Sequence, residues 1–174
     1  MIFTAFADGW MELPGRVVRC ALGSAGVVAG GAKREGDGAS PAGLWPMRRV
    51  LWRPDRGPAP PTRLACAPIA PDDGWCDAPD DSAYNQPVRL PYGASAERLW
   101  REDRLYDMVV ILGHNDSPVV PGAGSAIFLH LASPDCAPTQ GCVALAPGDL
   151  AHLLSLARPG DAVRIRREQR VVQT

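Results

Sequence analysis

Cys142 and His130 are the residues whose types and spacing point most directly to chemistry. The cysteine follows Thr139, Gln140 and Gly141, and it lies twelve residues after the histidine. A thiol attacks as its thiolate, yet its ordinary pKa of about 8.5 leaves it mostly protonated at neutral pH, so a catalytic cysteine needs a neighbouring base. Histidine is the usual one. The pair predicts covalent acyl transfer, with Cys142 as nucleophile and His130 as base.

Gly141, directly before the nucleophile, has a physical use at such a site. Without a Cβ, glycine lets the backbone turn sharply and lets a substrate approach the amides. The amides of Gly141 and Cys142 are candidates to bind the negative oxygen of a tetrahedral intermediate, where one donor contributes about 2.7 to 4 kcal/mol. Thr139 is expected to support the turn by bonding backbone groups.

Two apolar runs must bring the pair together. Residues 125–132 are typical of a strand that carries His130, and residues 142–145 of a strand that begins at the cysteine. Pro134 and Pro138 lie between them and predict a hairpin-like return. The alternative is structural: a buried cysteine at the start of a strand and a histidine satisfied in the core.

Short apolar runs rich in valine dominate the rest of the chain and predict β-structure. We expect strands at residues 16–23, 25–30, 48–53, 106–113, 125–132 and 162–166. Glycine and proline mark two long loops, 30–46 and 53–81. Apolar residues recur at helical spacing over 95–105 and 147–160. The pattern favours a mainly β, mostly antiparallel architecture with one or two short helices, in a single domain of residues 1–174.

Charge and cysteine usage exclude several classes of protein. A net charge of -1 with interspersed signs gives no indication of a nucleic-acid or membrane surface. Asp8 and Glu12 interrupt the stretch where a secretory signal needs an apolar run, so we expect a cytoplasmic protein, or a periplasmic one if the natural start lies upstream. The five cysteines cannot all pair and lack the spacing of a structural zinc site. We predict at least one free thiol, no metal and no cofactor.

Three further polar residues are candidates to line the same cleft. His114 ends the expected strand 106–113, where it would contact substrate or act as a second acid; capping the strand end is the alternative. Tyr84 and Asn85 form a polar pair in a loop. They either line the cleft or hold the loop.

The segment "IFLH", which ends at His130, and the later segment "PTQGCVAL" together resemble a signature of the L,D-transpeptidase catalytic domain, also called the YkuD-type domain. That signature reads His … Ser/Thr-His-Gly-Cys. "KREGDGASPAGLWP" is similar to that family's upstream Lys … Thr-Pro-x-Gly segment, here Lys33, Ser40, Pro41 and Gly43. The resemblance implies an L,D-transpeptidase-like antiparallel β-sandwich or barrel. It also implies that the cysteine attacks the carbonyl at the L-centre of a diamino acid, usually meso-diaminopimelate, at its bond to D-alanine in a peptidoglycan stem peptide.

The resemblance also assigns roles and shows departures. Cys142 matches the nucleophile, His130 the base, and Gly141 with Cys142 the oxyanion-binding amides. Gln140 stands where the family has its second histidine, Ala144 where it commonly has a polar residue, and the spacing from histidine to cysteine is shorter than usual. Gln140 still donates and accepts hydrogen bonds, so the departures concern how the substrate is held rather than the thiol chemistry.

The fate of the acyl-enzyme decides the product. We expect hydrolysis, an L,D-carboxypeptidase activity on recovered tetrapeptide fragments, because no export signal is seen; transpeptidation that forms cross-links is the first alternative. A zinc enzyme using His114, His130 and Cys142, or a non-catalytic module that binds wall fragments, are the others. The expected partner is a stem peptide or muropeptide. The candidates to bind its terminal carboxylate are Lys33, Arg34, Arg48 and Arg89.

Overall fold

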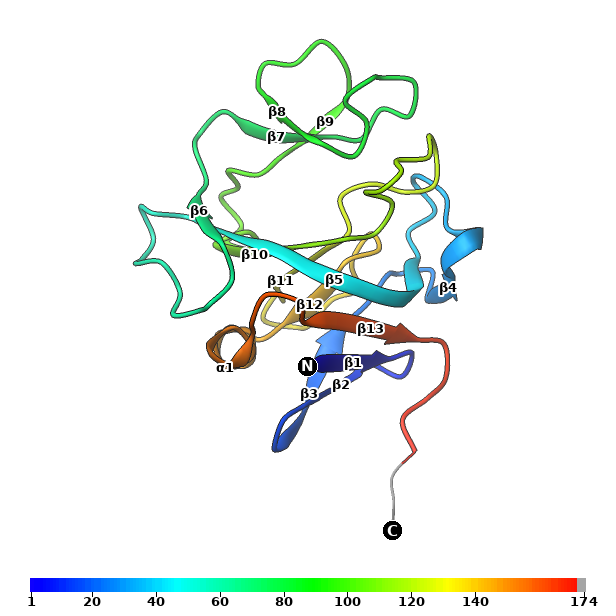
Figure 1. Ribbon diagram of the computed structural model, residues 1–174, viewed down its shortest axis with the longest axis vertical. Helices are drawn as coiled ribbons and strands as arrows, with labels where there is room; N and C mark the ends of the chain where they lie inside the picture. Colours follow the sequence, from blue (N-terminus) through cyan, green and yellow to red (C-terminus); the bar gives the residue numbers. More distant parts are fainter. Residues whose placement is uncertain (172–174) are drawn as a thin grey trace.

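The computed structural model describes residues 1–171, which form a barrel of strands with one α-helix (Figure 1). The strands are β1 (Ile2–Phe6), β2 (Trp10–Leu13), β3 (Arg16–Ala21), β4 (Val27–Ala29), β5 (Ser40–Trp52), β6 (Cys66–Pro68), β7 (Asp73–Cys76), β8 (Pro87–Arg89), β9 (Ala96–Arg98), β10 (Met108–Leu112), β11 (Phe128–Leu131), β12 (Val143–Leu145) and β13 (Ala162–Arg166). Helix α1 spans Pro147–Leu156, and a short 3-10 turn, η1, spans Gly30–Ala32.

Strand β5 closes the barrel. It is 13 residues long, so its first half pairs antiparallel with β13 and its second half antiparallel with β10. The hydrogen-bonded path β10-β11-β12-β3-β2-β1-β13 therefore returns to β5. The predicted mainly β fold with few helices is confirmed.

Not all pairs in the barrel are antiparallel. Strands β1 and β13 pair in parallel, and so do β11 and β12. The expected hairpin-like return between the strands of His130 and Cys142 is therefore wrong. The loop after β11 runs back to the level where β11 begins, so that Cys142, directly before β12, lies near the start of β11.

Apolar side chains fill the barrel, and α1 closes one end of it. Phe3, Met11 and Leu129 are fully buried inside. Leu150, Leu153 and Leu154 form the buried stripe of α1, at the spacing of one helix face. Full burial of each such side chain contributes about 1.5–3 kcal/mol. Ala157 is already extended, so the helix ends before residue 160, where the sequence placed its end.

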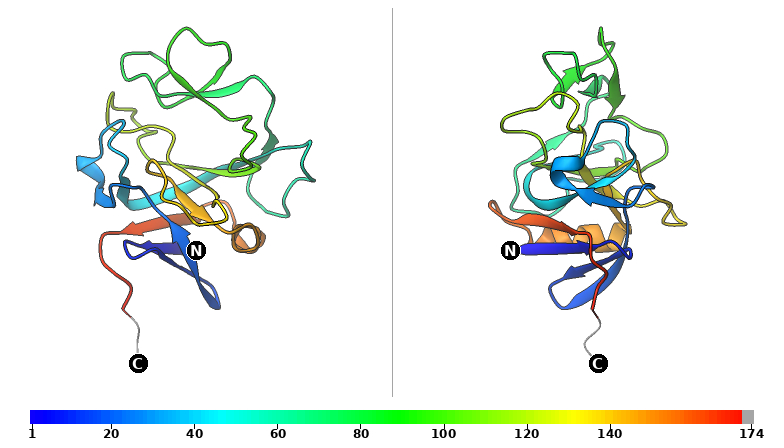
Figure 2. Two further views of the ribbon diagram at one scale, coloured as in Figure 1. Left: turned by 180° about the vertical axis from the view of Figure 1, so that it is seen from behind. Right: turned by 90° about the vertical axis from the view of Figure 1, so that its right-hand side faces the viewer.

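A second, three-stranded sheet, in the order β8-β7-β9, forms within the segment between β6 and β10. It lies at the end of the molecule opposite α1 and strands β1 to β3, as all three views show (Figures 1 and 2). Trp75 of this sheet packs edge-on against Phe128 of β11, with ring centroids 5.3 Å apart. The small sheet therefore covers the face of β11 that also carries His130.

Three further sequence predictions of local structure are wrong. The segment 95–105 is not helical: Ala96–Arg98 forms β9 along β7, and Arg104 adopts a positive φ of 66°, which a helix does not allow. The loops expected at 30–46 and 53–81 contain the start of β5 and the strands β6 and β7. Pairing with distant strands outweighed local glycine and proline signals in both loops.

No helix within residues 1–171 has the length and apolarity needed to cross a membrane.

Candidate active site

His130 and Cys142 line one cavity of about 530 Å³. The parallel register places His130 opposite Ala144, and Ala144 lines the same cavity. Because side chains two apart on a strand point to one face, Cys142 and Ala144 of one segment face the same space as His130 of its neighbour. The structure therefore places the predicted nucleophile and base in one cavity, on neighbouring segments.

The thiol of Cys142 is largely enclosed, with 8% of the residue exposed. Its Sγ donates to the Ala126 carbonyl oxygen at 3.1 Å and accepts from the Phe128 amide at 3.3 Å. Burial raises the pKa of the thiol to about 12, and the nearby carboxylate of Glu97 adds to that rise. The resting nucleophile is thus a neutral thiol, and its proton must leave as it attacks.

The imidazole of His130 has a defined tautomer. Its Nδ1 lies 2.8 Å from the Leu131 carbonyl oxygen, which can only accept, so Nδ1 carries the proton and donates it. Nε2 remains as the basic nitrogen. Burial lowers the pKa of this histidine to about 4, and the ring of Tyr106 packs against it at a centroid distance of 5.1 Å. His130 is therefore a rigid, neutral base at physiological pH.

Gly141 and Thr139 shape the turn before the cysteine. Gly141 has a φ of 129°, and a Cβ there would lie 2.8 Å from the Ala39 carbonyl oxygen, so the position requires glycine. The Thr139 hydroxyl donates to the Cys142 carbonyl oxygen at 2.7 Å and accepts from the Gly141 amide at 3.1 Å. The Gly141 amide would have to leave this partner to bind an oxyanion, so its predicted role stays a prediction.

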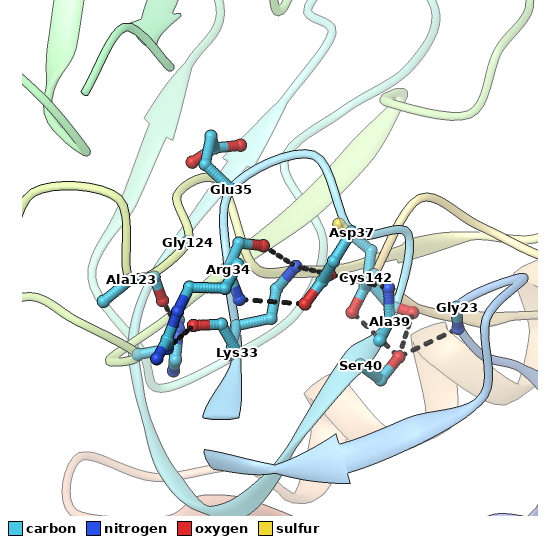
Figure 3. A network of polar contacts seen from close by, with 12 residues as sticks. Gly23, Lys33, Arg34, Glu35, Asp37, Ala39, Ser40, Ala123, Gly124 and Cys142 are labelled. Atoms are coloured by element: carbon cyan, nitrogen blue, oxygen red, sulfur yellow. Dashed lines mark hydrogen bonds and ion pairs between the residues drawn. The ribbon is translucent and has the colours of Figure 1, made fainter. Parts of the chain in front are cut away.

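Ser40, from the upstream motif, ties that turn to the barrel. Its buried hydroxyl donates to the Gly141 carbonyl oxygen at 2.8 Å and accepts from the Gly23 amide at 2.9 Å (Figure 3). A single hydroxyl on β5 thus fixes the backbone next to the nucleophile, one hundred and one residues away in the chain.

Replacing Ser40 by alanine should destabilise the protein by about 1–3 kcal/mol, because it leaves the Gly141 carbonyl and the Gly23 amide buried without this partner. Turnover should fall as well, since the nucleophile's turn loosens. Chemical denaturation measures the first effect. Ser24, which is exposed, is the matched control, and a Ser24→Ala variant should unfold like the parent. Equal stability of the two variants would contradict the role of Ser40.

Lys33, the other polar residue of the upstream motif, has a structural position. It is 3% exposed, and its ammonium contacts the Asp37 carboxylate and the Arg34 carbonyl oxygen (Figure 3). Asp37 also accepts from the amides of Arg34 and Ala39. This network holds the segment that leads into β5.

None of the four basic candidates for the substrate carboxylate lines the cavity. Lys33 pairs with Asp37, Arg48 with Asp116 and Arg89 with Asp72. The Arg34 guanidinium donates to two backbone carbonyls. The sequence missed Arg101, which does line the cavity and whose guanidinium lies over the Tyr106 ring.

Gln140 is exposed and lines the cavity, whereas His114 does not line it. The buried His114 ring packs edge-on against Trp45 at 4.7 Å, and its Nε2 lies 3.0 Å from the Ala123 carbonyl oxygen. These contacts favour the structural alternative for His114 over a contact with substrate.

Tyr84 and Asn85 support the segment that leads into β11. Asn85 accepts from the Trp75 indole and from the Ala126 amide, both at 3.0 Å, and its own amide donates to the His114 carbonyl oxygen. The Tyr84 hydroxyl accepts from the Gly124 amide at 3.0 Å. Neither residue lines the cavity, so the structure places them behind the site rather than at the substrate.

Besides Arg101, the sequence also missed four cavity residues with ionisable side chains. Glu35, Asp77, Glu97 and Tyr106 line it beside Cys142. Each comes from a different loop, short strand or turn, and no motif marked any of them. Among residues 1–171, no group of three or more histidine, cysteine or acidic side chains could hold a metal ion.

A closed β-barrel that holds a neutral thiol and a neutral imidazole at one cavity has the arrangement of a candidate cysteine acyl-transfer domain. The family model of the L,D-transpeptidase catalytic domain (YkuD) matches residues 3–165, and the chain belongs to this family. A comparison with curated proteins finds no match.

Solved structures that are similar to this chain share little of its sequence. L,D-transpeptidase 1 of Mycobacterium tuberculosis is 13% identical, with a TM-score of 0.42, over 95% of this chain and 60% of its own. An L,D-transpeptidase from Mycobacterium smegmatis is 14% identical, with a TM-score of 0.39, over 94% and 57%. The helical cell shape determining protein Pgp2 from Campylobacter jejuni is 13% identical, with a TM-score of 0.43, over 98% and 48%. The chain thus spans about half to three fifths of these proteins.

Proposed function

We propose that this chain catalyses cysteine-dependent acyl transfer on peptidoglycan stem peptides, at the bond between the L-centre of diaminopimelate and D-alanine. The observation that carries the proposal is the shared cavity of Cys142 and His130, with the Nδ1 proton of the histidine held by the Leu131 carbonyl. Membership of the L,D-transpeptidase catalytic domain family supports the substrate class.

The proposed reaction has two half-reactions. Nε2 of His130 takes the Sγ proton as sulfur attacks the carbonyl carbon, and backbone amides near Cys142 stabilise the tetrahedral oxyanion. The imidazolium returns the proton to the leaving amine, and D-alanine departs from the thioester. A second nucleophile, deprotonated by the same histidine, then attacks the thioester and restores the thiol.

We propose water as the second nucleophile, which makes the chain an L,D-carboxypeptidase. An attacking amine must be neutral, but the carboxylates that line the cavity beside Cys142 stabilise the ammonium form of an amine. Water carries no such penalty. Cross-linking is the second candidate, and one observation favours it: another cavity of about 540 Å³ shares Leu105 and Ser133 with the first and has room for an acceptor peptide.

Incubation with a disaccharide tetrapeptide, followed by mass spectrometry, tests the proposal. Tripeptide and free D-alanine are the expected products. Dimers with little tripeptide would instead establish cross-linking. A carbapenem should add one adduct mass at Cys142 in either case; absence of both products and adduct would indicate a module that binds without catalysis.

A further inference from the structure

The catalytic cavity carries an excess of negative charge. Glu35, Asp77 and Glu97 line it, and so does one basic residue, Arg101, whose guanidinium lies 3.5 Å from Oε1 of Glu97 and leaves the other two acids in excess. Glu35 lies in the segment before β5, Asp77 directly after β7, and Glu97 in β9, so the fold gathers the three acids from distant parts of the chain. Burial raises the pKa of Glu97, the Tyr106 hydroxyl and the Arg101 charge oppose that rise, and the charges of Asp77 and Glu35 add to it, so both of these acids act on Glu97.

Tyrosine hydroxyls hold two of these carboxylates in place. The Tyr84 hydroxyl donates to Oε2 of Glu35 and the Tyr106 hydroxyl to Oε1 of Glu97, both at 2.5 Å. Each carboxylate keeps a second oxygen for another donor. The Glu35 side chain points away from the network of Lys33 and Asp37, so that buried ammonium does not neutralise it (Figure 3).

Two acceptors in the same cavity lack a donor. Oγ of Ser125, a residue only 7% exposed, and Oδ1 of Asp77 are both buried without a hydrogen-bond partner among residues 1–171. Buried polar atoms are normally satisfied, so unpartnered ones that line a cavity indicate a ligand that brings hydrogen bonds. A carboxylate oxygen can only accept, so the ligand must donate to Asp77.

We infer that this acidic end of the cavity is a subsite for an ammonium group, held by Glu97, Asp77 and Glu35 with Ser125. An ammonium has three donors and one positive charge, which matches several acceptors and a negative excess. The inference rests on the proposed function for the identity of the ligand: the free side-chain ammonium of the diamino acid whose carbonyl Cys142 attacks. The substrate class is therefore a stem peptide whose diamino acid has an unmodified side-chain amine, and peptides already acylated at that amine are excluded.

Binding measurements test the inference without relying on turnover. On a Cys142→Ala background, calorimetry compares a tetrapeptide with a free side-chain amine and the same peptide N-acetylated there. The free peptide should bind about 10²-fold more tightly, the scale of a lost desolvated charge pair. Adding Glu97→Gln or Asp77→Asn should weaken binding of the free peptide about tenfold or more and leave the acetylated one unchanged.

The matched control is Asp72→Asn, directly before strand β7 of the small sheet. Asp72 is half exposed and pairs with Arg89 outside the cavity, so this change should alter neither affinity. Equal affinity for the two peptides would overturn the inference, and so would equal losses for both peptides in the Glu97 and Asp77 variants. A clear preference for the free amine, together with no turnover by the parent protein, would uphold the subsite and overturn the proposed function instead.

Discussion

Replacing Cys142 by serine should lower turnover of the tetrapeptide by about 10⁴- to 10⁶-fold, the scale seen when a hydrolase loses its nucleophile. The serine hydroxyl can take over the contacts of the thiol with Ala126 and Phe128, so the fold should be kept. A hydroxyl is a far weaker nucleophile beside a histidine whose pKa is lowered to about 4. Product formation by mass spectrometry measures the loss.

Two other variants sharpen that result. Cys142→Ala removes the sulfur altogether and leaves the Phe128 amide and Ala126 carbonyl without it, so it should also lose about 1–3 kcal/mol of stability. Cys66→Ser is the matched control, because Cys66 is an exposed free thiol away from the cavity. Full activity of Cys142→Ser, or an equal loss in Cys66→Ser, would contradict the assignment of the nucleophile.

The parts of the fold that could be predicted are those whose residues are buried by the barrel itself. The apolar runs at 106–113 and 125–132 became β10 and β11, and the stripe of leucines after Pro147 became α1. The burial of α1 repeats with the period of a helix, whereas β10 and β11 are buried on both faces and are visible in the sequence as continuous apolar runs. The segment 95–105 shows the limit of this reasoning. Leu99 is buried because β9 pairs with β7, not because it lies on a helix face.

The candidate site divides in the same way. Cys142 and His130 carry chemistry by type and lie in or next to apolar runs that form neighbouring strands, so sequence reasoning could name both. Nothing in the sequence distinguishes Glu35, Asp77 and Glu97 from acidic residues of an ordinary surface. They meet at one cavity only because β7 pairs with β9 and because the segment before β5 passes beside them. His114 shows the opposite error. Its type suggested chemistry, but packing against Trp45 places it outside the cavity.

The charge state of the catalytic pair predicts an unusual dependence of thiol reactivity on pH. Burial raises the pKa of the Cys142 thiol to about 12, so this acid stays protonated until strongly alkaline pH. Burial lowers the pKa of His130 to about 4, so this base stays uncharged above that pH. Between these values both groups are neutral, and no thiolate–imidazolium pair is stored at rest.

Alkylation of Cys142 by iodoacetamide should therefore be slow at pH 7, where the thiolate fraction is about 10⁻⁵, and should rise about tenfold per pH unit through pH 9 without a plateau. His130→Ala should leave this profile almost unchanged, because the neutral imidazole does not stabilise the thiolate. The same variant should lower kcat/KM by about 10²- to 10⁴-fold, because the proton can no longer be taken up during attack. Exposed Cys66 also reacts, so the measurement uses a Cys66→Ser protein and follows the adduct on the peptide that contains residue 142. A plateau at or below pH 7 that His130→Ala abolishes would show a stored ion pair instead, with the histidine acting before the substrate arrives rather than during the attack.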